Sequence, residues 1–168
     1  ASNDGSSEIF KKLEKENKIR LITNKNNLGQ SKSITLGVKI SSFDNIITLD
    51  GDGQNDPNDI LKLIDFYQNK NCDLIGGIRK NRKDSILKIF SSIIANSIRS
   101  AILKDNCKDT GCSLKIFKKN IFLKFPFFNG LHRFLPALFS GYGYNTFFVN
   151  VNHRRRKYGT SKYDTFFR

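Results

Sequence analysis

Residues 45–57 read NIITLDGDGQNDP, an apolar run followed by a turn rich in Asp and Gly. The run Asn45–Leu49 predicts a buried strand, and the segment Asp50–Asp56 predicts a loop. Pro57 suits the first turn of a helix, because its missing N–H would have no partner there. We therefore expect a helix over Asn58–Gln68. A strand, a loop and a helix in this order are typical of an α/β sheet.

The alternation of strand-length apolar runs with longer amphipathic stretches continues on both sides. It predicts an α/β fold with a mostly parallel sheet flanked by helices. Expected helices run from a cap at Ser6 or Ser7 to about Asn17, over Gln30–Ser42 and over Asp84–Leu103. Expected strands cover Ile19–Thr23, Cys72–Ile78, Ser113–Phe117 and Asn145–Val151. An aromatic-rich segment follows over Phe122–Phe139, and a basic tail over His153–Lys162.

The composition limits the class of protein. The chain has 168 residues, of which 38% are hydrophobic, so we treat residues 1–168 as a single domain and exclude disorder, collagen and coiled coil. The three cysteines have no Cys-x-x-Cys spacing, which favours a reducing compartment. The first residues read as the end of a strand entering a turn. We therefore expect a fragment that lacks its first strand and is also cut short at the C-terminus.

Four acidic residues stand together in an otherwise basic chain: Asp50, Asp52, Asp56 and Asp59. Like charges this close repel one another unless a cation or hydrogen-bond donors compensate them. Asp-x-Asp after a strand, with the neutral oxygen of Gln54 nearby, suits Mg²⁺ or Mn²⁺ bridging substrate phosphates. Turn formation alone is the alternative explanation for this composition. A calcium loop is disfavoured, because the twelfth position of such a loop, which requires Glu, would be Leu61.

The net charge also raises a function of another class. With 29 Lys plus Arg against 15 Asp plus Glu, the charge is +14, which would attract a nucleic-acid backbone. However, no RNA-binding signature or zinc finger is present, and the acidic cluster would repel a polyanion. We therefore expect no nucleic-acid partner and keep a basic nucleic-acid-binding module only as an alternative.

Seven motifs in order resemble glycosyltransferase family 2 enzymes of the dolichyl-phosphate mannose synthase type. The motifs are NDGS at 3–6, NLGQ at 27–30, LDGDGQNDP at 49–57, GGIR at 76–79, DTGCSLK at 109–115, GLHRFLP at 130–136 and HRRRKYGTSKY at 153–163. The resemblance implies a GT-A fold, which is Rossmann-like. It also implies metal-dependent, inverting transfer of a sugar from a UDP- or GDP-linked donor to polyprenyl phosphate. A non-lipid acceptor such as a polysaccharide is the alternative.

On the donor side, the resemblance assigns roles to five residues. It implies that Asp4 lies near the nucleoside, that Asp50 lies near the ribose, and that Asp52 and Gln54 hold Mg²⁺ or Mn²⁺ on the diphosphate. Arg79 would add positive charge near the phosphates, although a solvated surface Arg is the alternative. A metal placed there would stabilise the departing diphosphate as a Lewis acid.

On the acceptor side, the resemblance implies that Asp109 is the catalytic carboxylate. A turn residue is the alternative for Asp109. It also implies that Arg154, Arg156 and Lys162 bind acceptor or donor phosphates, for which the fixed fork of Arg donors is suited. The role of the pair His132–Arg133 stays open. The oligomeric state is not indicated.

Two departures concern these motifs. Asn3 replaces the commoner first Asp of the Asp-Asp-Gly-Ser turn, and Ile93 stands where relatives carry an Arg in the acceptor region.

The aromatic segment and the helix over Asp84–Leu103 bear on location. Both can lie against a bilayer, with basic residues meeting anionic lipid heads. For the helix we favour core packing, because any core-facing helix is amphipathic. The family resemblance implies a peripheral location at the cytoplasmic face of the membrane.

Overall fold

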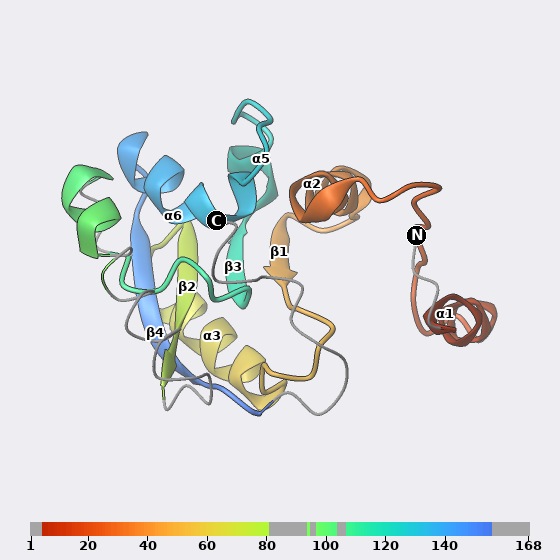
Figure 1. Ribbon diagram of the computed structural model, residues 1–168. Coiled ribbons are helices and arrows are strands. Elements are labelled where there is room, and N and C mark those ends of the chain that lie inside the picture. The colour runs from red at the N-terminus through yellow and green to blue at the C-terminus, as the bar shows by residue number, and fades with distance from the viewer. Residues whose placement is uncertain (1–4, 81–93, 95–96, 104–106, 156–168) are drawn as a thin grey trace.

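The computed structural model describes residues 5–80, 94, 97–103 and 107–155 (Figure 1). Helices and strands are interspersed along the chain, which confirms the predicted α/β class. In chain order they are α1 (Ser6–Lys15), α2 (Gly29–Ile40), β1 (Asn45–Thr48), α3 (Asn58–Asn69), β2 (Leu74–Lys80), β3 (Lys115–Lys118), α5 (Lys119–Phe122), α6 (Leu131–Gly141) and β4 (Thr146–Asn152). Residues 97–103 are also helical.

The strands form one sheet in the order β1-β3-β2-β4. β2 and β4 pair in parallel, from Leu74 opposite Thr146 to Lys80 opposite Asn152. β3 pairs antiparallel with both β1 and β2. β1, β2 and β4 therefore run in one direction, as we expected for most of the sheet, and β3 is reversed. The sequence pattern did not indicate this reversal, because a short apolar run is compatible with either direction.

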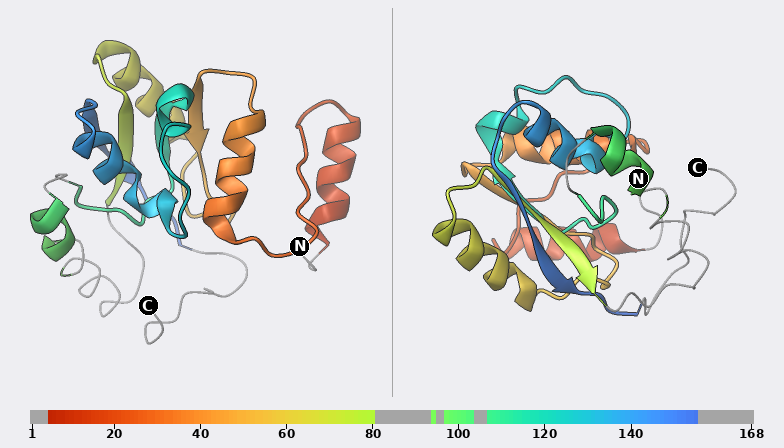
Figure 2. Two further views of the ribbon diagram at one scale, coloured as in Figure 1. Left: turned by 90° about the horizontal axis from the view of Figure 1, so that it is seen from above. Right: turned by 90° about the vertical axis from the view of Figure 1, so that its left-hand side faces the viewer.

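Helices cover both faces of the sheet, with α3 on one side and α2 and α6 on the other (Figure 2). Each strand contributes side chains to both cores, because successive side chains of a strand point to opposite faces of the sheet. Leu74 and Phe117 pack with residues of α2, α5 and α6. Their neighbours Ile75 and Ile116 pack against Leu63 of α3. The strands therefore pack between two cores, and the loops of the candidate site leave from their ends.

The N-terminal part departs from our expectations. Ile19–Thr23 is not a strand, and Ile19 and Ile22 are 39% and 44% exposed. A strand needs a neighbour, and none of the strands in the described ranges pairs with this segment. α1 begins after Gly5, whose φ is 79°, and no side chain caps it, so the predicted serine cap is wrong. α1 has no buried residue and stands apart from the sheet (Figure 1).

The predicted helix over Asp84–Leu103 is described only at residue 94 and over 97–103, where it is helical. The core-packing expectation is wrong for Ile94, Ile98 and Ile102, which are 46%, 58% and 73% exposed. The aromatic segment is divided, since Phe125 is buried in the core and Phe127 is 45% exposed. Within the described ranges, none of the helices is both long and apolar enough to cross a bilayer.

Candidate functional site

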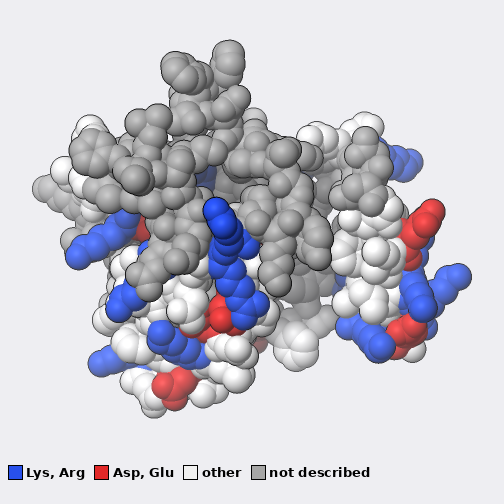
Figure 3. Space-filling view, turned by 60° about the horizontal axis from the view of Figure 1, so that its bottom comes forward, with Lys and Arg blue, Asp and Glu red and all other residues white. Residues whose placement is uncertain are grey.

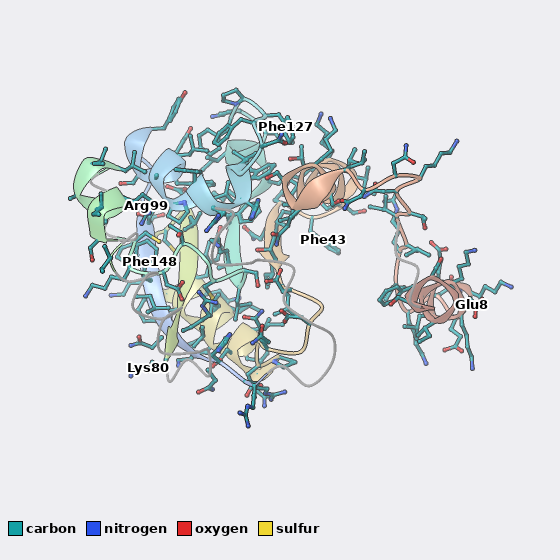
Figure 4. All side chains as sticks on the ribbon, in the orientation of Figure 1. Glu8, Phe43, Lys80, Arg99, Phe127 and Phe148 are labelled. Carbon is teal, nitrogen blue, oxygen red and sulfur yellow. The ribbon has the colours of Figure 1, made fainter. Side chains whose placement is uncertain are left out.

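A small cavity lies where the carboxyl ends of β1, β2 and β4 meet the amino end of β3. Lys80, labelled in Figure 4, marks the end of β2 at this edge. Because β3 is reversed, the loop that precedes it enters the same edge. The cavity is lined by Asp50, Asp52, Gln54, Asn55, Arg79, Gly111, Ser113 and His153. Its volume of about 20 Å³ has room for one water-sized ligand.

Ser113 organises the wall of this cavity. Its Oγ accepts hydrogen bonds from the backbone N–H of Asp50 at 3.1 Å and from Nδ2 of Asn55 at 2.9 Å. Its carbonyl oxygen accepts a hydrogen bond from Oγ1 of Thr48 at 2.6 Å. Ser113 therefore joins the loop before β3 to the loop after β1.

The surroundings of the Asp50 carboxylate shift its pKa. Burial raises its pKa above the ordinary value, a hydrogen bond from Ser113 acts in the opposite direction, and the nearby charge of Asp52 raises it further. Nε2 of Gln30 donates to Asp50 Oδ1 over 3.1 Å. Two carboxylates on one small cavity favour the presence of a cation, because a positive charge offsets both burial and mutual repulsion.

Arg79 and Asp109 form a two-pronged ion pair. Arg79 Nε lies 2.7 Å from Asp109 Oδ2, and Nη2 lies 2.8 Å from Oδ1. The backbone N–H of Arg79 donates to Oδ2 as well, at 3.1 Å. A Cβ on Gly111 would come within 2.8 Å of Arg79 Nη2, so this glycine leaves the space that the guanidinium occupies. Arg79 lines the cavity, whereas Asp109 is buried behind it. Both predicted roles stay predictions, and the geometry adds that Asp109 orients Arg79.

The acidic cluster divides into two pairs with different partners. Asp50 and Asp52 line the cavity, whereas Asp56 and Asp59 tie α3 and its preceding loop to the end of β4. Asp56 Oδ1 lies 2.7 Å from Nη2 of Arg154, and buried Asp59 accepts the backbone N–H of Asn152 at 2.6 Å. The hydrogen bond from the backbone N–H of residue 58 and the pair with Arg154 lower the pKa of Asp56. Asp56 is therefore the member of the cluster whose charge is balanced by an Arg side chain, and Asp59 is held by the end of β4.

Arg154 thus pairs with a carboxylate and is not among the residues that line the cavity, and its predicted role in phosphate binding stays a prediction. Its backbone N–H also donates to the carbonyl of Gln54 at 2.8 Å, and Asn55 and His153 form an isolated antiparallel β-bridge. These links place His153 in the cavity wall. Asp4, Arg156 and Lys162 lie outside the described residues, so their predicted roles stay predictions.

The residues that were not predicted all lie inside or beside the quoted motifs. They are Gln30, Asn55, Gly111, Ser113 and His153. Their positions within the motifs were visible in the sequence. Their convergence was not, because Ser113 meets Asn55 across 58 residues and Gln30 meets Asp50 across 20.

The donor set at the cavity fits a hard divalent ion. Asp50, Asp52 and Gln54 offer oxygen atoms, and His153 offers an imidazole nitrogen, which Mn²⁺ also accepts. Asp52 Oδ1 accepts the backbone N–H of Gln54 at 3.0 Å, which draws these two residues into one turn. Within the described part of the chain, no group of three or more His, Cys, Asp and Glu side chains is already gathered around a single metal position.

Comparison with known proteins identifies relatives over most of the chain. This chain is 34% identical over 148 residues to a dodecaprenyl-phosphate galacturonate synthase from Rhizobium johnstonii, and the match covers 86% of this chain and 44% of that protein. It is 30% identical over 164 residues to an undecaprenyl-phosphate 4-deoxy-4-formamido-L-arabinose transferase from Pectobacterium atrosepticum, covering 96% of this chain and 50% of that protein. The chain spans about half the length of the curated relatives it matches.

Solved structures share the fold. Glucosyl-3-phosphoglycerate synthase from Mycobacterium tuberculosis in complex with UDP superposes with a TM-score of 0.69 at 13% identity, covering 95% of this chain and 59% of that one. The same enzyme with Mn²⁺, UDP-glucose and phosphoglyceric acid gives 0.61 at 12% identity, covering 94% and 59%. This likeness confirms the GT-A-like α/β fold. Residues 1–127 match the sequence profile of glycosyl transferase family 2. The profile covers more than half of the chain, including the turn with Asp50 and Asp52 and the pair of Arg79 and Asp109, and the chain therefore belongs to glycosyl transferase family 2.

Proposed function

We propose that this chain is the catalytic part of an enzyme that transfers a sugar from a nucleoside-diphosphate donor to polyprenyl phosphate at the cytoplasmic face of a membrane. The observation that carries the proposal is the convergence of Asp50, Asp52 and Gln54 on one cavity beside Arg79. The curated relatives support the acceptor class, because their names specify dodecaprenyl and undecaprenyl phosphate.

Mg²⁺ or Mn²⁺ would be held by Asp52 and Gln54, with Asp50 and His153 beside it. When bound, the metal supplies Lewis-acid stabilisation of the departing diphosphate. The Mycobacterium tuberculosis neighbour, whose structure contains Mn²⁺ and UDP-glucose, supports this proposal. Because the cavity has room for one water-sized ligand, the nucleotide and sugar would lie outside it, against its mouth.

The proposed reaction is a single displacement with inversion. An oxygen of the acceptor phosphate forms a bond to the anomeric carbon as the bond from that carbon to the diphosphate oxygen breaks, and the nucleoside diphosphate leaves with the electron pair. The acceptor phosphate is already anionic at neutral pH, so no strong base is required, and the main task of the protein is positioning. Arg79, oriented by Asp109, places a fixed positive charge at the cavity wall.

An exposed apolar surface supports the membrane part of the proposal. Ile98, Ile102, Leu103 and Phe134 line a depression of about 360 Å³ beside Arg99, which is labelled in Figure 4. Ile98 and Ile102 are four residues apart in the helix over 97–103, so they share one helix face, and Ile94 is exposed as well. We call Ile94, Ile98, Ile102, Leu103 and Phe134 the apolar surface. Exposed apolar side chains beside a cation such as Arg99 are suited to the boundary between lipid heads and acyl chains.

The charge distribution favours this function over nucleic-acid binding. In Figure 3, Lys and Arg side chains are interspersed with Asp and Glu on the face shown. Arg154, one of the cations of the basic tail, is paired with Asp56. A polyanion would find repulsion as well as attraction on this face.

The test combines binding and transfer in the full-length protein. Titration calorimetry with UDP and with GDP, each with and without Mn²⁺, should show metal-dependent binding of one nucleotide that Asp52→Ala abolishes. Asp65→Ala removes an exposed carboxylate from α3 and serves as the matched control. Transfer to polyprenyl phosphate in vesicles should follow the same pattern. Transfer that persists without the lipid acceptor would favour the polysaccharide alternative, and full turnover by Asp52→Ala in saturating Mn²⁺ would refute the metal role.

A further inference from the structure

The first turn of α2 carries three consecutive side chains that contact three different parts of the molecule. Gln30 Nε2 donates to Asp50 Oδ1 at the cavity over 3.1 Å. Ser31 Oγ lies 2.7 Å from Nδ1 of His132, the second residue of α6. Lys32 Nζ lies 4.9 Å from the ring centroid of Phe127, which Figure 4 labels. One helical turn therefore joins the cavity to α6 and to the aromatic segment.

Ser31 is held from two sides. It is 6% exposed, and its Oγ accepts the backbone N–H of Gly130 at 2.9 Å in addition to its contact with His132. Burial, together with the charges of Lys115 and Arg133, lowers the pKa of His132 to about 4. His132 is therefore neutral at pH 7, and Nδ1 can accept the hydroxyl hydrogen of Ser31. Ser31 Oγ then donates to Nδ1 of His132 and accepts from the backbone N–H of Gly130.

Gln30 is suited to orient Asp50 without neutralising it. A Lys at this position would form an ion pair and reduce the negative charge that the cavity offers to a cation. An amide donates one hydrogen bond and carries no net charge, so it fixes Oδ1 and leaves the carboxylate charge in place. Consecutive residues of a helix share a rigid backbone, so the anchoring of Ser31 also fixes the position of Gln30.

Resting on the function proposed above, we propose that Gln30 is a positioning residue for Asp50 in donor binding, and that Ser31, held by His132 and Gly130, fixes the turn from which Gln30 reaches it.

The experiment measures nucleotide binding by the full-length protein in Mn²⁺, using whichever of UDP and GDP binds. Gln30→Met keeps the length of the side chain and removes the donor, and we expect the Kd to rise about tenfold, as is typical for a lost hydrogen bond to a charged group. Ser31→Ala should raise the Kd in the same direction, and Ser31→Thr, which restores the hydroxyl, should recover part of the loss. Ser33→Ala is the matched control. It removes a hydroxyl from the same helix, and the hydrogen bonds of that hydroxyl are to Gly29 and Asn24.

A double-mutant cycle separates positioning from a general effect on the fold. If Gln30 acts through Asp50, the effects of Gln30→Met and Asp50→Ala on the Kd will not add, because Asp50→Ala removes the carboxylate that Gln30 positions. Additive effects would overturn the proposal. Gln30→Met also keeps the test valid if Ser31→Ala fails to fold.

Two negative results have different meanings. Wild-type binding that Gln30→Met leaves unchanged overturns the role of Gln30 and leaves the proposed function intact. Absence of nucleotide binding by the wild-type protein in Mn²⁺ overturns the proposed function and this inference with it.

Discussion

The guanidinium of Arg79 at the end of β2 and the carboxylate of Asp109 in the loop before β3 meet in a two-pronged ion pair, with N···O distances of 2.7 and 2.8 Å. The side chains are 15% and 7% exposed. The desolvation of both charges offsets much of their attraction, but removal of either partner would leave an uncompensated buried charge. In this protein the pair fixes a positive charge at the cavity wall.

Removing one partner of this pair should therefore destabilise the protein and reduce transfer. Asp109→Ala leaves the Arg79 charge without its carboxylate, and we expect unfolding free energy to fall by about 3–5 kcal/mol. Urea unfolding measures this change. The double variant Arg79→Met with Asp109→Leu should recover stability but not transfer. If that double variant transferred sugar at the wild-type rate, the pair would have no part in the reaction.

A methyl group on Gly111 should affect the same guanidinium without removing any charge. The added Cβ would lie 2.8 Å from Arg79 Nη2, so the guanidinium must shift within its ion pair. We expect Gly111→Ala to reduce kcat about tenfold, a loss of about 1.4 kcal/mol in barrier terms, with a small change in Tm. Gly37→Ala in α2 is the control, since its Cβ would meet nothing within 4 Å. Equal rates for the two variants would contradict the role given to Arg79.

The stability of the fold should depend on pH through His132. Its pKa falls from 6.5 to about 4 in the folded protein, mainly because of burial. Between these two values the unfolded chain binds a proton that the folded chain does not, so stability is complete above pH 6.5 and decreases as the pH falls toward 4. Tm should decrease as the pH is lowered from 6.5 to 4. In His132→Gln, the dependence of Tm on pH should be weaker. An unchanged slope in the variant would assign the effect to other groups.

The apolar surface should bind membranes independently of the donor site. Ile98→Ser with Ile102→Ser removes two exposed apolar side chains, so we expect several-fold weaker sedimentation with anionic vesicles and an unchanged Tm. Nucleotide binding should also be unchanged. Leu61→Ser is the matched control, because Leu61 is 70% exposed on α3 but lies outside this surface. Equal loss of vesicle binding in the control would show that the surface is not specific.

Local sequence signals predicted most of the elements well. The helices α2 and α3 and the strand β1 lie within two residues of the expected bounds, because helical periodicity, Pro57 and the Asp-Gly turn act over a few neighbouring residues. The same signals placed Asp50 and Asp52 after a strand, but the prediction that this strand is buried is wrong. None of the residues of β1 is buried and Leu49 is 44% exposed, because β1 is the last strand on its side of the described sheet. The placement of the two Asp residues after a strand was sufficient to predict where the cavity lies.

The predictions that the structure overturned depended on distant partners. Ile19–Thr23 has the composition of a strand, but a strand exists only beside another strand, and in the described ranges none pairs with it. The apolar face of the helix at Ile98 and Ile102 was expected in the core and is exposed instead. Periodicity shows that a face is apolar and does not show what covers it.

The sequence by itself determined the α/β class, the boundaries of the central elements and the residue types that can hold a metal at a strand end, because these follow from short-range sterics and turn chemistry. Only the tertiary structure decided that β3 is reversed, that Asp56 and Asp59 bind the end of β4, and that Ser113 and Gln30 meet Asp50. These contacts join residues 20 to 98 positions apart. Their formation depends on how two packed cores align the strand ends, and no local pattern encodes that alignment.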